Sequence, residues 1–99
     1  MNKNKAVFLD RDGVINKNKI NYVKTIEELE ILPSIGIPIK KLKNNNYFVI
    51  VITNQSPINR KLMTHEQLNK IHSSIQQHLE PFDTSIDKFY FCPHVPEDN

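Results

Sequence analysis

The 99-residue sequence predicts an α/β fold in which about three parallel strands alternate with two main helices. The main observation is the run Tyr-Phe-Val-Ile-Val-Ile at residues 47–52, which is almost continuously apolar and β-branched. Such a run is typical of a parallel strand that is buried on both faces. Segments with helical periodicity lie on either side of it, and shorter apolar runs lie near both ends of the chain. Because strand–helix–strand crossovers are right-handed, this order predicts a parallel sheet.

The first third of the chain is expected to hold one short strand and its connection. Residues 5–9 form an apolar strand in this interpretation, and residues 13–22 form a polar loop or flap over its end. Residues 25–32 are expected to contain a short helical turn before Pro33.

A helix is predicted over residues 34–45, with Ile35, Ile39 and Leu42 on one face. Pro38 is compatible with it only in the first turn, where the missing N–H has no partner to lose. Three asparagines at 44–46 then end the helix.

A loop over residues 53–63 is expected to separate the central strand from a second helix. Thr64 and Gln67 match a capping box, so the helix should begin there and continue to about Leu79. Its buried face would carry Leu68, Ile71, Ile75 and Leu79, while His65, His72 and His78 are interpreted as surface residues. A last strand is predicted at residues 88–91.

The composition indicates one small globular domain, with 38% hydrophobic and 24% charged residues. No apolar run approaches the roughly 20 residues that a bilayer-spanning helix needs, and no signal-type segment follows the N-terminus, so a cytoplasmic location is expected. The net charge of +2 gives little support to a nucleic-acid or membrane partner. The single cysteine, Cys92, excludes an internal disulfide.

Asp10 and Asp12 follow the first strand directly, and Gly13 then allows a turn. Two carboxylates at the carboxyl end of a parallel strand suit a cation and a phosphate, because ligands collect at that edge of the sheet. An ordinary Asp–Gly turn is the alternative interpretation. A calcium loop is excluded, because its glycine would come two positions later than Gly13 does.

Four motifs together resemble the haloacid dehalogenase superfamily of phosphatases, in the branch that contains heptose bisphosphate phosphatases and histidinol-phosphatase domains. They are residues 8–13 (Phe-Leu-Asp-Arg-Asp-Gly), 51–56 (Val-Ile-Thr-Asn-Gln-Ser), 58–60 (Ile-Asn-Arg) and 92–94 (Cys-Pro-His). The resemblance implies a Rossmann-like three-layer fold with a parallel sheet. Residues 1–99 would be the N-terminal portion of such a domain, so the sheet would be incomplete.

The resemblance implies that Asp10 attacks phosphorus and forms an aspartyl phosphate. Asp12 would protonate the leaving oxygen and then activate water. Mg²⁺ would bind the Asp10 carboxylate and the Asp12 backbone carbonyl. The substrate would be a small sugar phosphate such as D-glycero-D-manno-heptose 1,7-bisphosphate, with histidinol phosphate as an alternative.

The resemblance also implies a set of substrate-binding residues in the loops at the strand ends. Thr53 would bond a phosphoryl oxygen, although a threonine at a strand end can equally bond its own backbone. The other candidates are Lys19, Ile20, Asn21 and Tyr22 in the flap, and Asn54, Gln55, Ser56 and Arg60 after the central strand. Pro57 and Lys61 stand where relatives commonly have glycine.

Cys92 and His94 are similar to the first half of a zinc loop in this branch. A structural zinc ion wants four ligands, so these two residues form an incomplete site.

The lysine that holds the phosphoryl group and the later acid that completes the Mg²⁺ shell would lie in the family's second half. A truncated product is therefore one expectation. A sheet completed by self-association or by a second chain is the other, because the first strand would leave an apolar edge exposed.

Three interpretations remain open at this point. The first is a sugar-phosphate phosphatase, and the second is a non-catalytic remnant or partner-binding fragment of one. The third is the phosphatase portion of a polynucleotide kinase, which shares the Asp-x-Asp-Gly and Thr-Asn-Gln motifs. The Cys-Pro-His segment, together with the lack of a basic, aromatic-rich surface, argues against the third.

Overall fold

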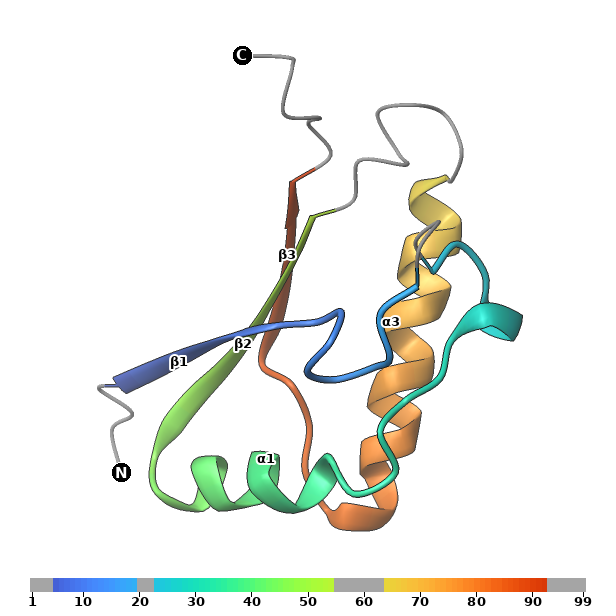
Figure 1. The fold of residues 1–99 in the computed structure, drawn as a ribbon. Coiled ribbons are helices and arrows are strands. Elements are labelled where there is room, and N and C mark those ends of the chain that lie inside the picture. The colour runs from blue at the N-terminus through green and yellow to red at the C-terminus, as the bar shows by residue number, and fades with distance from the viewer. Residues whose placement is uncertain (1–4, 20–22, 55–63, 93–99) are drawn as a thin grey trace.

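The structure of the chain is a computed structural model, which describes three stretches: residues 5–19, 23–54 and 64–92. Three parallel strands form one sheet in the order β1-β2-β3, with β2 in the centre (Figure 1). They are β1 (Lys5–Asp10), β2 (Tyr47–Asn54) and β3 (Lys88–Cys92). The predicted parallel sheet of three strands is confirmed.

Two main helices connect these strands, as the sequence predicted. Helix α1 (Gly36–Asn44) lies between β1 and β2 in the chain, and α3 (His65–Leu79) lies between β2 and β3. Short 3₁₀ helices, η1 (Ile26–Glu28) and η2 (Glu80–Phe82), precede α1 and follow α3. Within the described stretches, none of the helices has the length and apolar character that crossing a bilayer requires.

Local sequence signals account for the helix ends. In the capping box, Thr64 Oγ1 accepts a hydrogen bond from the Gln67 backbone N–H at 3.0 Å, and Gln67 Oε1 accepts one from the Thr64 N–H at 2.8 Å. Pro38 is the third residue of α1, inside the first turn as expected. After α1, Asn46 takes a left-handed φ of 67°, which asparagine tolerates better than most residues.

The strands extend further than the sequence predicted. Thr53 and Asn54 were expected in a loop, but they belong to β2 because they pair with Phe91 and Cys92 of β3. The rest of the predicted loop, residues 55–63, lies outside the described stretches.

The start of the predicted flap is part of the folded core. Ile15 and Asn16 are completely buried, which contradicts the expectation of a polar loop over the strand end. Two backbone hydrogen bonds hold the segment in place, from Leu32 N–H to the Ile15 carbonyl at 3.0 Å and from Lys17 N–H to the Glu30 carbonyl at 2.8 Å.

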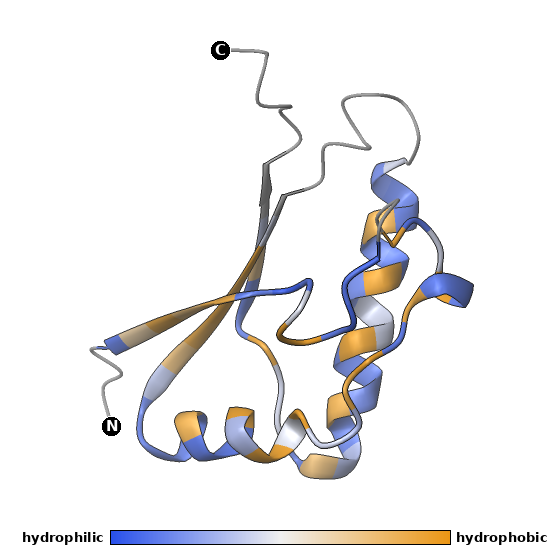
Figure 2. Ribbon diagram, in the orientation of Figure 1, coloured by the Kyte–Doolittle hydropathy of each residue, from blue (hydrophilic) through white to orange (hydrophobic). Residues whose placement is uncertain are grey.

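Both main helices pack on the same face of the sheet, where the hydrophobic core lies. Val49 and Val51 of β2 are completely buried there, against Ile39 of α1 and against Leu68, Ile71, Ile75 and Leu79 of α3. Figure 2 shows the apolar stripes of the helices and the apolar central strand.

On the opposite face, the side chains of Phe48 and Ile52 are 41% and 40% exposed. The prediction that this strand is buried on both faces is therefore wrong for the described part of the chain. The reason is topological. Two right-handed crossovers that advance in one direction along a sheet place both helices on one face.

The packing of α1 against η2 leads to a first prediction. A Cβ atom added at the buried Gly36 would lie 2.2 Å from Cγ of Phe82, which is far inside van der Waals contact. We expect Gly36→Ala to lower the free energy of unfolding by roughly 1–3 kcal/mol, measured by urea denaturation.

The matched control is the same substitution in a Phe82→Ala background. There the overlap is gone, and the higher helix propensity of alanine should make Gly36→Ala neutral or stabilising by up to about 1 kcal/mol. An equal loss of stability in both backgrounds would contradict this account of the contact.

Candidate active site

The candidate site lies where β1 and β2 end side by side. Asp10, the last residue of β1, is in register with Ile52, and the Arg11 N–H donates to the Ile52 carbonyl at 3.0 Å. The segment after β1 therefore passes directly beside Thr53 of β2. There the Asp12 carboxylate meets the Thr53 hydroxyl, at the carboxyl edge of the parallel sheet, where ligands collect in such folds.

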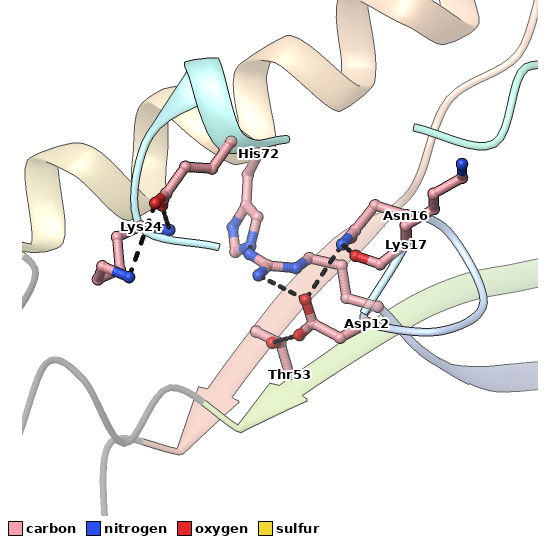
Figure 3. Close-up of polar contacts among 8 residues, drawn as sticks. Asp12, Asn16, Lys17, Lys24, Thr53 and His72 are labelled. Atoms are coloured by element: carbon pink, nitrogen blue, oxygen red, sulfur yellow. Dashed lines mark hydrogen bonds and ion pairs between the residues drawn. The ribbon is translucent and has the colours of Figure 1, made fainter. Parts of the chain in front are cut away.

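The carboxylate of Asp12 is held by three side-chain donors (Figure 3). Oδ1 accepts hydrogen bonds from Arg11 Nη2 at 3.0 Å and from Asn16 Nδ2 at 3.1 Å. Oδ2 accepts one from the Thr53 hydroxyl at 3.0 Å. These contacts come from the end of β1, the turn after it and the end of β2, so they fix the position of the carboxylate relative to the sheet.

A tight turn brings Asn16 back onto Asp12. Gly13 has a φ of 92°, a conformation that residues with a Cβ rarely adopt. Its N–H donates to the Asn16 carbonyl at 2.7 Å, and the Arg11 carbonyl accepts from the N–H groups of Ile15 and Asn16. The glycine of the Asp-x-Asp-Gly motif is therefore required for the contact between Asn16 and Asp12.

Arg11 joins the site to helix α3. Its side chain is completely buried, with Nη2 on Asp12 and Nη1 3.2 Å from Nε2 of His72. Because a guanidinium only donates, Nε2 must accept, and the imidazole is neutral with its proton on Nδ1. The ring of His72 also stacks on Phe89 of β3, with centroids 4.1 Å apart.

The interpretation of His72 as a surface residue was wrong, because its side chain is 8% exposed. Burial, and secondarily the charge of Arg11, lower the pKa of His72 from 6.5 to about 4, although Asp12 opposes this. Its position four residues after the buried Leu68 is the signal that could have placed it on the inner face of α3.

Asp10 differs from Asp12 in being exposed at the end of β1. The two residues offer oxygen donors that suit Mg²⁺, namely the exposed Asp10 carboxylate and the Asp12 backbone carbonyl. In the turn of residues 11–16, the carbonyls of Arg11 and Asn16 accept backbone hydrogen bonds. Within the described stretches, the Asp12 carbonyl accepts none from the backbone. The donor set therefore fits the ligands that the sequence implied.

The other predicted site residues are only partly covered by the structure. Lys19 forms an ion pair with Glu30, and its hydrogen bond is the main reason that the pKa of Glu30 is lowered. A second ion pair joins Lys24 to Glu28, and Figure 3 shows Lys24 and Asp12 on opposite sides of His72. In these two ion pairs the lysines bind glutamates, not the aspartates of the candidate site.

Several predicted site residues lie outside the described stretches: Ile20, Asn21, Tyr22, Gln55, Ser56, Arg60 and His94. Asn54 and Cys92 are the last residues of β2 and β3. Across the part of the chain that the structure describes, no group of three or more His, Cys, Asp or Glu residues could hold a metal ion. Zinc thus gains no support.

The fold of the chain is similar to that of solved haloacid dehalogenase-like phosphatases. A solved D,D-heptose 1,7-bisphosphate phosphatase from B. bronchiseptica, in complex with magnesium and phosphate, is similar to 96% of this chain, with a TM-score of 0.88 and 35% identity. A structure from Mesorhizobium loti described as a haloacid dehalogenase-like phosphatase is similar with a TM-score of 0.84 and 25% identity, again over 96% of this chain.

More particularly, the chain belongs to the polynucleotide kinase 3 phosphatase family, whose model matches residues 5–94. Two curated relatives are named D-glycero-beta-D-manno-heptose-1,7-bisphosphate 7-phosphatase. The Helicobacter pylori protein is 41% identical over all of this chain, and the Rhodopseudomonas palustris protein is 40% identical over 93% of it. The matched family is therefore the one behind the polynucleotide-kinase interpretation of the sequence. The two relatives carry a name that belongs to the sugar-phosphate phosphatase interpretation.

The chain spans about half the length of the proteins that it matches. It covers 57% of the H. pylori relative, 51% of the R. palustris relative and 53% of the B. bronchiseptica structure. The predicted correspondence to the N-terminal half is confirmed.

The buried neutral His72 makes stability depend on pH. The unfolded chain takes up a proton near pH 6.5, but the folded chain does so only near pH 4. The neutral His72 therefore leaves the folded state at full stability above pH 6.5, and part of that stability is lost as pH falls to about 4. We expect this histidine to reduce the free energy of unfolding by roughly 3 kcal/mol across that window, measured by urea denaturation at each pH.

The variant His72→Phe keeps a ring beside Phe89 but cannot titrate, so its stability should change less between pH 6.5 and 4. His65→Phe, at an exposed position in the first turn of α3, is the matched control and should keep the wild-type slope. Equal slopes in wild type and His72→Phe would contradict the assignment.

Proposed function

We propose that this chain is the N-terminal portion of a Mg²⁺-dependent phosphomonoester hydrolase that acts on a small sugar phosphate such as D-glycero-D-manno-heptose 1,7-bisphosphate. The observation that carries the proposal is the contrast between the two aspartates. Asp10 is exposed at the strand end, whereas Asp12 is held by three donors beside it. The names of the curated relatives support the sugar phosphate as substrate.

In this proposal, Asp10 is the nucleophile. A carboxylate oxygen attacks phosphorus, a P–O bond to Asp10 forms, and the P–O bond to the sugar breaks. Asp12 gives a proton to the sugar oxygen as it leaves, and then takes one from the water that attacks the aspartyl phosphate. Inorganic phosphate leaves, and both carboxyl groups return to their starting states.

The held position of Asp12 suits this second role. A general acid must lie within reach of the leaving oxygen in each turnover, and three hydrogen bonds from Arg11, Asn16 and Thr53 remove the rotational freedom of the carboxylate. The Thr53 hydroxyl, expected to bond a phosphoryl oxygen, bonds Asp12 here. If this hydroxyl turned toward a phosphoryl oxygen when substrate bound, Arg11 and Asn16 would still hold Asp12.

Mg²⁺ would be held by the Asp10 carboxylate and the Asp12 carbonyl. When bound, it would offset the negative charge that otherwise repels the nucleophile from the phosphate. The complex of the B. bronchiseptica relative with magnesium and phosphate supports this cofactor. Zinc at Cys92 and His94 forms no part of the proposal.

Substrate choice would rest on the loops around the strand ends. Lys19, Ile20, Asn21 and Tyr22 in the flap, and Asn54, Gln55, Ser56 and Arg60 after β2, are the proposed contacts to the sugar and its second phosphate. Histidinol phosphate is one alternative substrate. A 3′-phosphorylated nucleic acid is another, and the description of the matched family favours it.

Two further possibilities concern the chain rather than the substrate. Turnover is expected to need the rest of the domain, through self-association or a second polypeptide that completes the sheet. A non-catalytic remnant or partner-binding fragment is the alternative from a different class, and it would keep the fold without turnover.

Phosphate release tests the proposal directly. The chain would be assayed alone and together with the C-terminal portion of the H. pylori relative, with heptose 1,7-bisphosphate, histidinol phosphate or a 3′-phosphorylated oligonucleotide. We expect release from the heptose substrate that requires Mg²⁺ and falls at least roughly 1,000-fold in Asp10→Asn. Asp83→Asn, a substitution at an exposed carboxylate far along the chain, should have no effect.

The Asp12→Asn variant separates the two roles. Loss of the general acid should lower kcat by about 100-fold or more, with a smaller change in KM. Release that is equal in wild type, Asp10→Asn and Asp12→Asn would contradict the proposed function. A faster reaction with the oligonucleotide would redirect the substrate assignment to nucleic acid.

A further inference from the structure

One histidine of helix α3 lies behind the candidate site and takes no part in the proposed reaction. His72 is 8% exposed, and its ring stacks on Phe89 of β3 with centroids 4.1 Å apart and planes inclined by 10°. Its Nε2 atom lies 3.2 Å from Nη1 of Arg11. In Figure 3 the ring of His72 points from helix α3 toward Asp12. The imidazole therefore connects strand β3 to the residue that stands between the two aspartates.

The guanidinium of Arg11 depends on this ring for one of its two hydrogen-bonded supports. Among the described residues, Nη2 donates to Asp12 Oδ1 at 3.0 Å, Nη1 donates to His72, and the buried Nε has no partner. A planar guanidinium that is held at two of its nitrogens keeps a fixed orientation. Without His72, the bond to Asp12 would be the one hydrogen bond of the guanidinium left in the described part of the chain.

His72 can support Arg11 because its Nε2 atom accepts a hydrogen bond. A guanidinium and an imidazolium both have donors only, so a charged ring would repel Arg11. Burial, and secondarily the charge of Arg11, lower the pKa of His72 to about 4, which keeps the ring neutral at neutral pH. The Nε2 lone pair lies in the plane of the ring, so the stacking on Phe89 fixes the direction in which it points.

Both carboxylate oxygens of Asp12 are thereby tied to neighbouring strands of the sheet. Oδ2 accepts a hydrogen bond from the hydroxyl of Thr53 in β2 at 3.0 Å. Oδ1 accepts one from Arg11, and the imidazole connects Arg11 to Phe89 of β3. Phe89 is in register with Val51, two residues before Thr53, so both supports start from adjacent points of the sheet. The carboxylate cannot move relative to the sheet without breaking one of them.

From these contacts we propose that His72 is a positioning residue, which acts through Arg11 to hold the Asp12 carboxylate in place for proton transfer to the leaving oxygen. The inference rests on the proposed function, because it concerns the step in which Asp12 gives its proton to the sugar oxygen. In the contacts of the described residues, His72 bonds Arg11 rather than an aspartate, so its effect on Asp12 passes through the guanidinium.

A purely structural role is the alternative, in which His72 does no more than satisfy a buried charge. Its loss would then lower stability, and any loss of activity would not depend on the leaving group. A misplaced general acid has a different signature. It slows the departure of a sugar alkoxide, which must be protonated, but has little effect on para-nitrophenolate, which leaves as a stable anion.

Two substitutions of His72 separate its hydrogen bond from its packing. His72→Phe keeps a ring on Phe89 but has no acceptor for Arg11. His72→Gln places an amide oxygen near the position of Nε2 and so restores the acceptor. His78→Phe is the matched control, because His78 lies on the same helix and its substitution also removes one hydrogen bond, to the Pro33 carbonyl at 3.1 Å.

Single-turnover cleavage measures the step that Asp12 assists. The chain, together with the C-terminal portion of the H. pylori relative, would be mixed in excess with heptose 1,7-bisphosphate or para-nitrophenyl phosphate, and release of the leaving group followed. We expect His72→Phe to slow cleavage of the sugar phosphate about 10–100-fold, and that of the aryl phosphate less than about threefold. His72→Gln should recover most of the lost rate, and His78→Phe should match wild type with both substrates.

A second measurement needs no turnover and uses the 99-residue chain itself. Nitrogen NMR of the isotope-labelled chain should show the proton of His72 on Nδ1 and slow solvent exchange of the Arg11 guanidinium hydrogens. These hydrogens should exchange at least about tenfold faster in His72→Phe, and at close to the wild-type rate in His72→Gln and His78→Phe. A proton on Nε2, or equally slow exchange in His72→Phe, would overturn the inference.

The two measurements distinguish failure of the inference from failure of the proposed function. Wild-type protein that cleaves neither phosphate would contradict the proposed function, while the exchange rates would still decide whether His72 holds the guanidinium on Asp12. Normal cleavage by wild type, with equal slowing of both substrates or no slowing in His72→Phe, would contradict the positioning role alone.

Discussion

The buried guanidinium of Arg11 constrains the arrangement of the candidate site more than any other group. A completely buried charge is stable only with close partners, and Asp12 and His72 supply them at 3.0 and 3.2 Å. This requirement ties the turn after β1 to helix α3. The Nε atom of Arg11 and the Oδ1 atom of Asn16 are buried without a partner among the described residues, which costs about 1–3 kcal/mol each. A functional site is where such a cost is expected.

The part of the site that sequence could predict is local. Asp10, Asp12 and Gly13 follow one apolar strand, and Thr53 ends another, so the rule for parallel sheets is enough to bring them together. The burial of Arg11 could not be predicted in this way, because it depends on His72, 61 residues away. The periodicity of α3 identified Leu68 and Ile71 as buried, but a histidine on that face was assigned to the surface by its residue type.

The central strand shows a different limit of prediction. Residues 47–52 are apolar at every position, which is typical of a strand with helices on both faces. In the described part of the chain, helices cover one face only. Periodicity shows that both faces of the strand are apolar, but it cannot tell whether the elements that would cover the second face lie within the same stretch of sequence.

Trapping of the covalent intermediate tests the central claim, that Asp10 reacts and Asp12 assists it, most directly. The complex with the second half of the domain would be mixed with substrate and Mg²⁺, quenched in acid and digested for mass spectrometry. The account predicts one phosphoryl group on the peptide that contains Asp10, absent without Mg²⁺ and absent in Asp10→Asn. Rapid phosphate release with no phosphorylated Asp10 peptide, or a phosphoryl group on another residue, would contradict it.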